Sequence, residues 1–408
     1  MSEALPHYVF VGAFKATASD GSVGGQTHAC TSLVTSRLSQ FVRWTLIDST
    51  MEGVGDRPLS RRAFYACRRL VQFAGKVARR DVDGALLFSS YGLSFIEKGV
   101  MALVAKGLGR RVVLSPRSGL LLDDLERSSF MRWFVPFVFR RCDVVICQGQ
   151  SWAHRYKQIS RHANTTFAVI PNWIDTEAYT IRQRTEAAPG VTRFLYLGRL
   201  ETYKGILDLV EAVGRYRHQL EGAKFVICGR GRAESGARAR TRRLGVEQFF
   251  DFRGWELADT KLETIARSDV LVLPSHREGL PNSLLEGMAA GLAVITTPVG
   301  GVPDIITSDH VGLCVEPGNV TALGAALVTL HTDPVRQRAL ATAGRAHVRD
   351  HDIDRVWPLF MDLLKLRSDS REACSNTSQA NATIQQPPVH TPLPLDKPTS
   401  EERGLLGS

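Results

Sequence analysis

Residues 269–301 constrain the fold more than any other stretch, because they contain a complete strand–loop–helix–strand pattern. The apolar run 269–273 has the composition of a buried parallel strand, and residues 293–297 have that of the next strand. Between them, apolar residues at helical spacing follow Asn282, a residue that favours the N-cap position, and end at Gly291. Two such strands joined by a helix predict a parallel sheet of the α/β class.

Two carboxylates of this unit are placed where a ligand would meet the sheet. Glu278 falls in the loop after the first strand, and Glu286 falls in the first turns of the helix. The free N–H groups of a helix N-terminus, with Gly279 beside them, suit a phosphate. Carboxylates and the backbone from Gly279 through Leu280 and Pro281 to Asn282 suit sugar hydroxyls. The pattern therefore predicts the outline of a nucleotide-sugar site.

The same alternation of apolar strands, Gly-containing turns and helices continues through most of the 408 residues. A chain of this length exceeds one ordinary core, so we expect two domains of similar size. The polar residues 180–192 lack apolar periodicity and are predicted to link them. We expect an N-terminal Rossmann-like domain over 1–180, a C-terminal one over 193–352, a helix over 353–366 that crosses back to the first domain, and a disordered tail over 367–408.

Two cations follow the first strand of the second half. Arg199 and Lys204 surround the turn after that strand, where they can offer a bidentate contact and a point charge to a diphosphate. Local pairing of these two cations with Glu201 or Asp208 is the alternative. Their combination with the two carboxylates favours the ligand site.

The first half carries its own candidates at predicted strand ends. Gly24 and Gly25 stand in a Gly-rich turn between a strand and a helix, the way in which mononucleotide-binding halves begin. Simple turn chemistry explains such a pair equally well. Arg117 follows another apolar strand, at the edge where open α/β sheets place ligands.

The formal net charge of +10 is concentrated between residues 51 and 160. An anionic partner such as nucleic acid, phospholipid head groups or a phosphate-bearing acceptor is one interpretation, and a solvated basic face is the other. Residues 61–80 predict a helix that is either an ordinary amphipathic one or a membrane-surface one. Its apolar face is predicted to hold Phe64, Cys67, Leu70, Val71 and Ala74. The aromatic residues of 128–141 predict a buried helix, with membrane contact as the alternative.

Cysteine usage and the N-terminus suggest a compartment. Seven cysteines without a CxxC pair indicate free thiols in a reducing environment. We find no signal-peptide pattern at the N-terminus and no uncharged run of the about 20 residues that a bilayer span needs. We therefore expect a cytoplasmic protein that at most binds the inner face of the membrane.

The second half closely resembles the retaining family-4 glycosyltransferases of the GT-B fold, known as glycosyl transferases group 1. The matching motifs are Gly198-Arg199-Leu200 with Lys204-Gly205, Gly229-Arg230-Gly231, Gly254-Trp255, Glu278-Gly279-Leu280-Pro281 with Glu286, and Gly300-Gly301-Val302-Pro303-Asp304. The first half resembles the family more weakly, in Gly24-Gly25 and in the turn Pro171-Asn172-Trp173-Ile174-Asp175. Pro116-Arg117-Ser118-Gly119 resembles a branch associated with bacterial surface polysaccharides.

The resemblance implies two doubly wound Rossmann-like domains that face a cleft, with the acceptor on the first domain and the nucleotide sugar on the second. It implies that Arg199 and Lys204 bind the diphosphate, that Glu286 binds the ribose, and that Glu278 contacts the donor sugar near its anomeric carbon. Gly24 and Gly25 would lie near the phosphates. Arg117 would meet the acceptor or a phosphate, since an arginine is no general base at neutral pH.

The activity implied is transfer of a sugar from a nucleoside-diphosphate sugar to a saccharide acceptor, which we expect to be lipid-linked, with retention and without a metal or cofactor. Positive charge would stabilise the departing diphosphate. A nucleotide-sugar epimerase of the same architecture is the alternative within enzymes. A basic nucleic-acid-binding protein is the alternative outside them, although no module that reads nucleic acid is evident in the sequence.

Overall fold

The computed structural model describes residues 5–15, 25–50, 59–161, 164–180 and 190–366. These residues belong to one compact unit. Gly24, most of the predicted linker 180–192 and the predicted disordered tail 367–408 lie outside the described residues.

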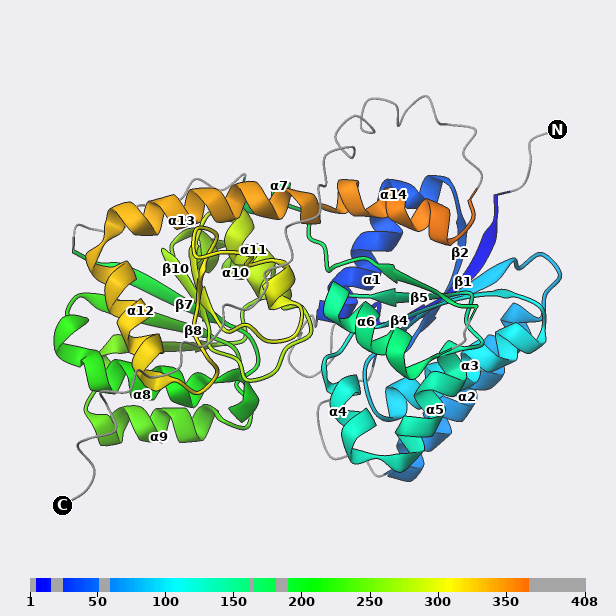
Figure 1. Cartoon of the computed structure of the whole chain (residues 1–408), viewed down its shortest axis with the longest axis horizontal. Coiled ribbons are helices and arrows are strands. Elements are labelled where there is room, and N and C mark those ends of the chain that lie inside the picture. Colours follow the sequence, from blue (N-terminus) through cyan, green and yellow to red (C-terminus); the bar gives the residue numbers. More distant parts are fainter. Residues whose placement is uncertain (1–4, 16–24, 51–58, 162–163, 181–189, 367–408) are drawn as a thin grey trace, which may run out of the picture. The chain divides into compact units, whose positions relative to one another are not determined.

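The first half of the chain forms a six-stranded parallel sheet in the order β2-β1-β3-β4-β5-β6 (Figure 1). Its strands are β1 His7–Gly12, β2 Arg43–Asp48, β3 Gly84–Ser89, β4 Arg111–Pro116, β5 Val144–Cys147 and β6 Thr166–Val169. Its α-helices are α1 Gly25–Thr35, α2 Leu59–Val77, α3 Leu93–Gly107, α4 Leu120–Arg127, α5 Ser129–Phe139, α6 Gln150–Ile159 and α7 Glu177–Thr180. A short 3-10 helix, η1, covers Arg37–Gln40.

The second half forms another six-stranded parallel sheet, in the order β12-β11-β10-β7-β8-β9. Its strands are β7 Thr192–Leu197, β8 Ala223–Cys228, β9 Phe250–Gly254, β10 Val270–Leu273, β11 Ala293–Thr296 and β12 Leu313–Cys314. Its α-helices are α8 Ile206–Tyr216, α9 Glu234–Leu244, α10 Ala258–Ala266, α11 Asn282–Ala289, α12 Val320–Thr332, α13 Pro334–His347 and α14 Ile353–Leu363. The predicted α/β class with two doubly wound sheets is confirmed.

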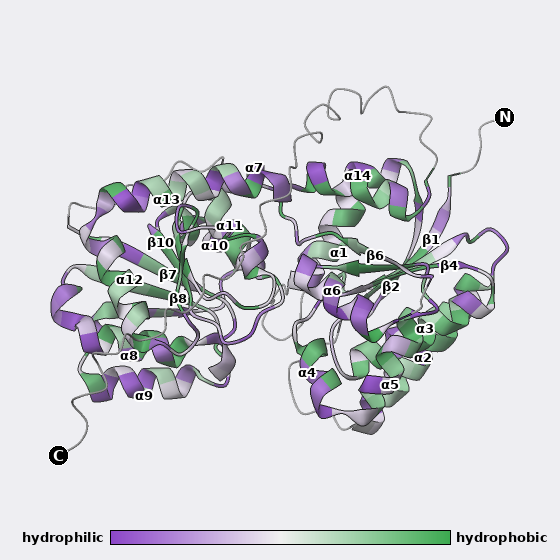
Figure 2. Ribbon diagram, in the orientation of Figure 1, coloured by the Kyte–Doolittle hydropathy of each residue, from purple (hydrophilic) through white to green (hydrophobic). Residues whose placement is uncertain are grey.

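Each sheet reverses its strand order once, between β1 and β3 in the first and between β7 and β10 in the second. Crossover helices then cover both faces, so the central strands are mostly apolar and every residue of β1 and β3 is buried. Figure 2 shows this as hydrophobic strands inside helices whose exposed positions are hydrophilic. Ligands of open α/β sheets bind at the carboxyl ends of strands beside such reversals.

Helix α14 packs on the first half although it follows the second half in sequence. Val356, Trp357 and Phe360 share a buried cluster with Tyr8 and Phe10 of β1. The Tyr8 hydroxyl also donates to the carbonyl of Leu364 at 2.5 Å. The chain therefore returns to the first sheet after completing the second one.

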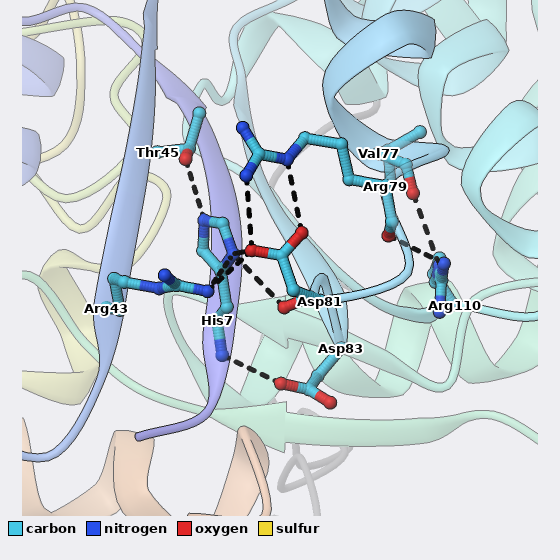
Figure 3. Close-up of polar contacts among 8 residues, drawn as sticks. All are labelled: His7, Arg43, Thr45, Val77, Arg79, Asp81, Asp83 and Arg110. Atoms are coloured by element: carbon cyan, nitrogen blue, oxygen red, sulfur yellow. Dashed lines mark hydrogen bonds and ion pairs between the residues drawn. The ribbon is translucent and has the colours of Figure 1, made fainter. Parts of the chain in front are cut away.

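The amino ends of the first sheet's strands hold a polar network that uses part of the basic surplus (Figure 3). The carboxylate of Asp81 accepts from Arg43 Nη2 at 2.7 Å and from Arg79 Nε at 3.1 Å. Arg110 donates to the carbonyls of Val77 and Arg79. These arginines link the segments at the amino ends of the strands. The carboxyl ends, where ligands of open α/β sheets bind, lie on the opposite side of the sheet.

The outer faces of α2 and α5 differ from the sequence predictions. In α2, Leu70 packs on the core as predicted, but Phe64 is 65% and Val71 74% exposed while Phe73 and Val77 are buried, so the predicted apolar face was wrong for Phe64 and Val71. The buried side of α2 packs against α3 instead. In α5, predicted to be buried, Trp133 is 59% exposed, because only one side of this helix packs on the core.

Candidate functional site

A cavity of about 630 Å³ lies at the carboxyl ends of both sheets' strands and collects the predicted site residues. Every predicted site residue that the structure describes lines it: Gly25, Arg117, Arg199, Lys204, Glu278, Gly279, Leu280, Pro281, Asn282 and Glu286. The first half contributes Gly25 and Arg117, and the second half contributes the rest. Residues far apart in the sequence thus meet around one space.

Lys204 and Glu278 form an ion pair in this cavity. The Lys204 Nζ lies 2.6 Å from Glu278 Oε2, and the Ser275 hydroxyl donates to the other carboxylate oxygen at 2.8 Å. The loop with Lys204 approaches the end of β10 closely because Gly205 adopts a φ of 72°. A Cβ at Gly205 would lie 1.9 Å from the carbonyl oxygen of Pro274, so only glycine fits there. The two predicted ligand groups therefore hold each other in position.

Glu286 forms a second ion pair, with Lys261 of α10, at 2.9 Å between Glu286 Oε1 and Lys261 Nζ. The Tyr179 side chain of α7 also hydrogen-bonds this carboxylate. Burial raises the pKa of Glu286, but the Lys261 ammonium and its hydrogen bond outweigh burial and hold the pKa below 4.5. Glu286 is thus a buried, ionised carboxylate at the wall of the cavity.

Arg199 is an exposed cation in the loop after β7. Among the described residues, its guanidinium has no hydrogen-bond or ion-pair partner. The alternative pairings with Glu201 or Asp208 are not observed for Arg199 or Lys204, and Asp208 pairs with His276 at 2.5 Å instead. Arg199 therefore presents its charge to the cavity.

Asn282 does not cap α11, contrary to the sequence prediction. The N-cap residue is Pro281, without a side-chain cap, because the Asn282 side chain is used elsewhere. Its Oδ1 accepts from Asn172 Nδ2 at 2.8 Å, and Asn172 Nδ2 also donates to the carbonyl of Leu280 at 2.5 Å. Asn172 thereby ties the loop before α11 to the end of the first half.

Arg117 follows β4 and lies between two aromatic rings. Its guanidinium carbon is 4.9 Å from the ring centre of Phe88 and 4.5 Å from that of Trp173. The Arg117 Nη2 donates to Asn172 Oδ1. Trp173, in the turn after β6, is fully buried, and its Nε1 donates to the Ser32 hydroxyl at 2.9 Å. The turn after β6 therefore holds the Arg117 side chain in position.

Sequence reasoning missed several residues of the cavity wall, among them Lys261, Tyr179, His28 and Gln148. Lys261 and Tyr179 come from short helices with weak apolar periodicity, which the sequence analysis left unassigned. Burial lowers the pKa of His28 below 6.5, so this side chain is neutral at pH 7. His28 and Lys261 are recognised as site residues only because they lie close to Glu286, and this closeness exists only in the folded chain.

Comparison with known proteins extends this picture. Residues 178–347 match the family described as Glycosyl transferases group 1. Glycogen synthase of Mycobacterium tuberculosis is 28% identical over 209 residues, which cover 51% of this chain and 50% of that protein. The lipopolysaccharide core biosynthesis glycosyltransferase LpsE of Rhizobium meliloti is 24% identical, covering 66% of this chain and 82% of LpsE. The chain thus spans about half the length of the first of these relatives.

Solved structures share the fold over most of the chain. Sucrose-phosphate synthase from Thermosynechococcus elongatus superposes with a TM-score of 0.71 at 16% identity, covering 88% of this chain and 98% of that one. Anabaena HepE, solved in complex with UDP-glucose, superposes with a TM-score of 0.65 at 16% identity, covering 88% and 99%. Within the described residues, every helix is too short or too polar to cross a bilayer. The predicted GT-B fold is confirmed, and residues 178–347 match the group 1 glycosyl transferase family.

Proposed function

We propose that this protein is a retaining glycosyltransferase that moves a sugar from a nucleoside-diphosphate sugar to a hydroxyl group of a saccharide acceptor, without a metal ion or another cofactor. The observation that supports this most is the single cavity in which Arg199, Lys204 and Glu286 meet. The group 1 domain and the UDP-glucose bound by HepE support the same class of donor.

The cavity offers one group for each part of such a donor. Arg199 is free to bind the diphosphate in a bidentate way, and Lys204 adds a second positive charge close by. A carboxylate has about four lone-pair positions, so Glu286 can accept from ribose hydroxyls while it keeps Lys261. Glu278 and the backbone of Gly279 face the sugar.

The reaction follows from this placement. The bond between the anomeric carbon and the diphosphate oxygen breaks, and the acceptor oxygen forms the new bond from the same face. The departing diphosphate gains negative charge, which Arg199 and Lys204 stabilise more strongly in the transition state than in the bound donor. The leaving phosphate oxygen takes the proton of the acceptor hydroxyl. Glu278, fixed by the Lys204 ammonium 2.6 Å away, contacts the donor sugar beside the reacting carbon.

We extend the proposal to the acceptor: a lipid-linked saccharide of surface-polysaccharide synthesis, reached at the anionic inner face of the cytoplasmic membrane. Helix α5 supports it, because Phe130 and Trp133 are exposed there beside the exposed Arg132 and Arg140. Aromatic rings with neighbouring arginines suit the head-group region of an anionic bilayer. The name of LpsE, a lipopolysaccharide enzyme, supports the same acceptor class.

A hydrolysis screen of nucleotide sugars tests the donor assignment without knowledge of the acceptor. Full-length protein is incubated with UDP- and GDP-sugars, and released nucleoside diphosphate is measured over time. We expect slow release from one donor, and retention is then read from the anomer first formed when a simple alcohol replaces water. Absence of both binding and hydrolysis for every nucleotide sugar contradicts the proposal.

A further inference from the structure

The charged side chains of the cavity are paired with each other or with neighbours, apart from two arginines. The pairs are Lys204 with Glu278, Lys261 with Glu286, Arg277 with Asp123, and Glu256 with Arg253. Among the described residues, Arg117 and Arg199 have no carboxylate partner. Arg199 lies at the strand ends of the second sheet and Arg117 at those of the first. One diphosphate held at Arg199 and Lys204 therefore leaves the charge of Arg117 without a counter-ion.

Arg117 is immobilised as well as unpaired. The rings of Phe88 and Trp173 fix the plane of the guanidinium, and Asn172 Oδ1 accepts from its Nη2. Burial lowers the pKa of Arg117 to about 10, so the group still carries its charge at pH 7. An isolated buried cation is costly, and an arginine held flat is organised for a planar or tetrahedral anion.

Two buried polar atoms, one of Arg117 itself and one of the neighbouring Gln148, also lack hydrogen-bond partners among the described residues. Arg117 Nη1 and Gln148 Oε1 make no hydrogen bond within the part of the chain that the structure describes. Gln148 is 2% exposed and donates its Nε2 to the same Asn172 oxygen, so its Oε1 is directed away from that contact. A Cβ at Gly279 would lie 3.1 Å from Gln148 Oε1, so glycine there keeps the approach open. Such atoms are normally satisfied, here by a ligand that both accepts and donates.

We propose that the saccharide bound in this cavity carries an acidic group, a carboxylate or a phosphate, that accepts from Arg117 Nη1 while a neighbouring hydroxyl donates to Gln148 Oε1. This inference rests on the glycosyltransferase function proposed above and names the class of its substrate: an acidic saccharide. The acid belongs either to the transferred sugar or to the acceptor. Both sources present the same chemistry to Arg117.

Matched ligand pairs separate the two sources. In the donor arm, affinities of the full-length protein are compared for UDP-glucose with UDP-glucuronate and for GDP-mannose with GDP-mannuronate. In the acceptor arm, protein saturated with UDP or GDP is titrated with methyl glucoside, methyl glucuronoside and glucose 6-phosphate. We expect the acidic member to bind at least about tenfold more tightly in one arm, the usual effect of a charge-assisted hydrogen bond.

Four variants identify the residue responsible. Arg117→Gln should abolish the preference for the acidic member, and Arg117→Lys should restore part of it. Arg199→Gln should weaken all nucleotides and keep the preference. Arg277→Gln is the matched control, because it removes a cavity cation that already has a carboxylate partner, and the preference should persist.

The outcomes distinguish this inference from the function on which it rests. Tight binding of UDP or GDP with no acidic preference in either arm overturns the inference and leaves the glycosyltransferase proposal standing. An Arg117→Gln variant that loses affinity for the bare nucleotide, again without a preference in the wild type, assigns Arg117 to the diphosphate and equally overturns it. Failure of the wild type to bind any nucleotide contradicts the proposed function. If Arg117→Gln does not fold, the wild-type pairs alone decide.

Discussion

The two halves of the molecule bring charge to the cavity in opposite ways. The second half supplies carboxylates that lysines already neutralise, Glu278 by Lys204 and Glu286 by Lys261. The first half supplies Arg117, which is held by aromatic rings and an amide oxygen and has no carboxylate among the described residues. The carboxylates of the second half are thus neutralised by lysines of that half, whereas Arg117, like Arg199 of the second half, has no carboxylate partner among the described residues.

This difference bears on the proposed function, in which the second half binds the donor and Arg117 of the first half meets the saccharide. Paired charges tolerate burial because their mutual attraction offsets the desolvation cost of each, so the lysines hold the two carboxylates of the second half in place. A cation without a carboxylate partner, such as Arg117, instead favours a ligand that brings an anionic group into the cavity. The second half also contains nearly all of the residues that match the group 1 family, which are residues 178–347.

The largest expected effect on stability tests the pairing itself. Lys261→Met leaves Glu286 buried without its cation, and we expect a loss of about 3 kcal/mol in the free energy of unfolding. Arg117→Met removes a cation that has no carboxylate partner, so its cost should stay near 1 kcal/mol. Urea denaturation of the two variants measures the contrast, and equal losses would contradict it.

The pH dependence of the stability that the Lys261–Glu286 pair contributes should change sign when Lys261 is replaced. In the wild type, the depressed pKa of Glu286 contributes stability that is complete above 4.5 and is lost as the pH falls through the folded value. Lys261→Met removes the largest of the effects that lower this pKa, and burial, which raises it, then dominates, so this contribution should fall as the pH rises. Unfolding free energies compared between about pH 4 and 7 measure the two slopes.

Donor turnover should depend strongly on the second half. Glu286→Ala and Lys204→Ala should each reduce nucleotide-sugar hydrolysis by about a hundredfold or more, because they remove contacts to the ribose and the diphosphate. Circular dichroism checks that each variant is folded. Near-normal rates for either variant would remove that residue from the site.

Arg199→Gln should have a smaller effect, because Lys204 still supplies one positive charge. We expect about a tenfold loss of affinity for the nucleoside diphosphate, as for one charge-assisted contact. Isothermal titration with UDP and GDP measures it. Unchanged affinity for both nucleotides would place the diphosphate elsewhere.

The smallest effect concerns the outer face of the first half. Replacing Phe130 and Trp133 together by serine should lower binding to vesicles of anionic lipid several-fold, because each exposed ring adds apolar contact with the bilayer. Val335→Ser is the control, since Val335 is 69% exposed on α13 of the second half. Equal flotation of the control and the double variant would argue against α5 as the membrane contact.

The sequence alone determined the strands, most of the helices between them and the class of the fold, because buried parallel strands and amphipathic helices leave distinct local patterns. It also singled out Arg199, Lys204, Glu278 and Glu286, whose positions at strand ends follow from that pattern. Phe64 and Val71 were placed on the wrong face of α2, because an apolar residue on the surface satisfies the same periodicity as one in the core.

Only the tertiary structure decided which charges meet. Lys261 and Glu286 are separated by 25 residues and lie on different helices, and nothing local connects them. The same holds for Phe88, Arg117 and Trp173, which come from separate strand ends of one sheet. Pairing and burial depend on how the segments pack against each other, so the neutralised carboxylates and the unpaired arginine became visible only in three dimensions.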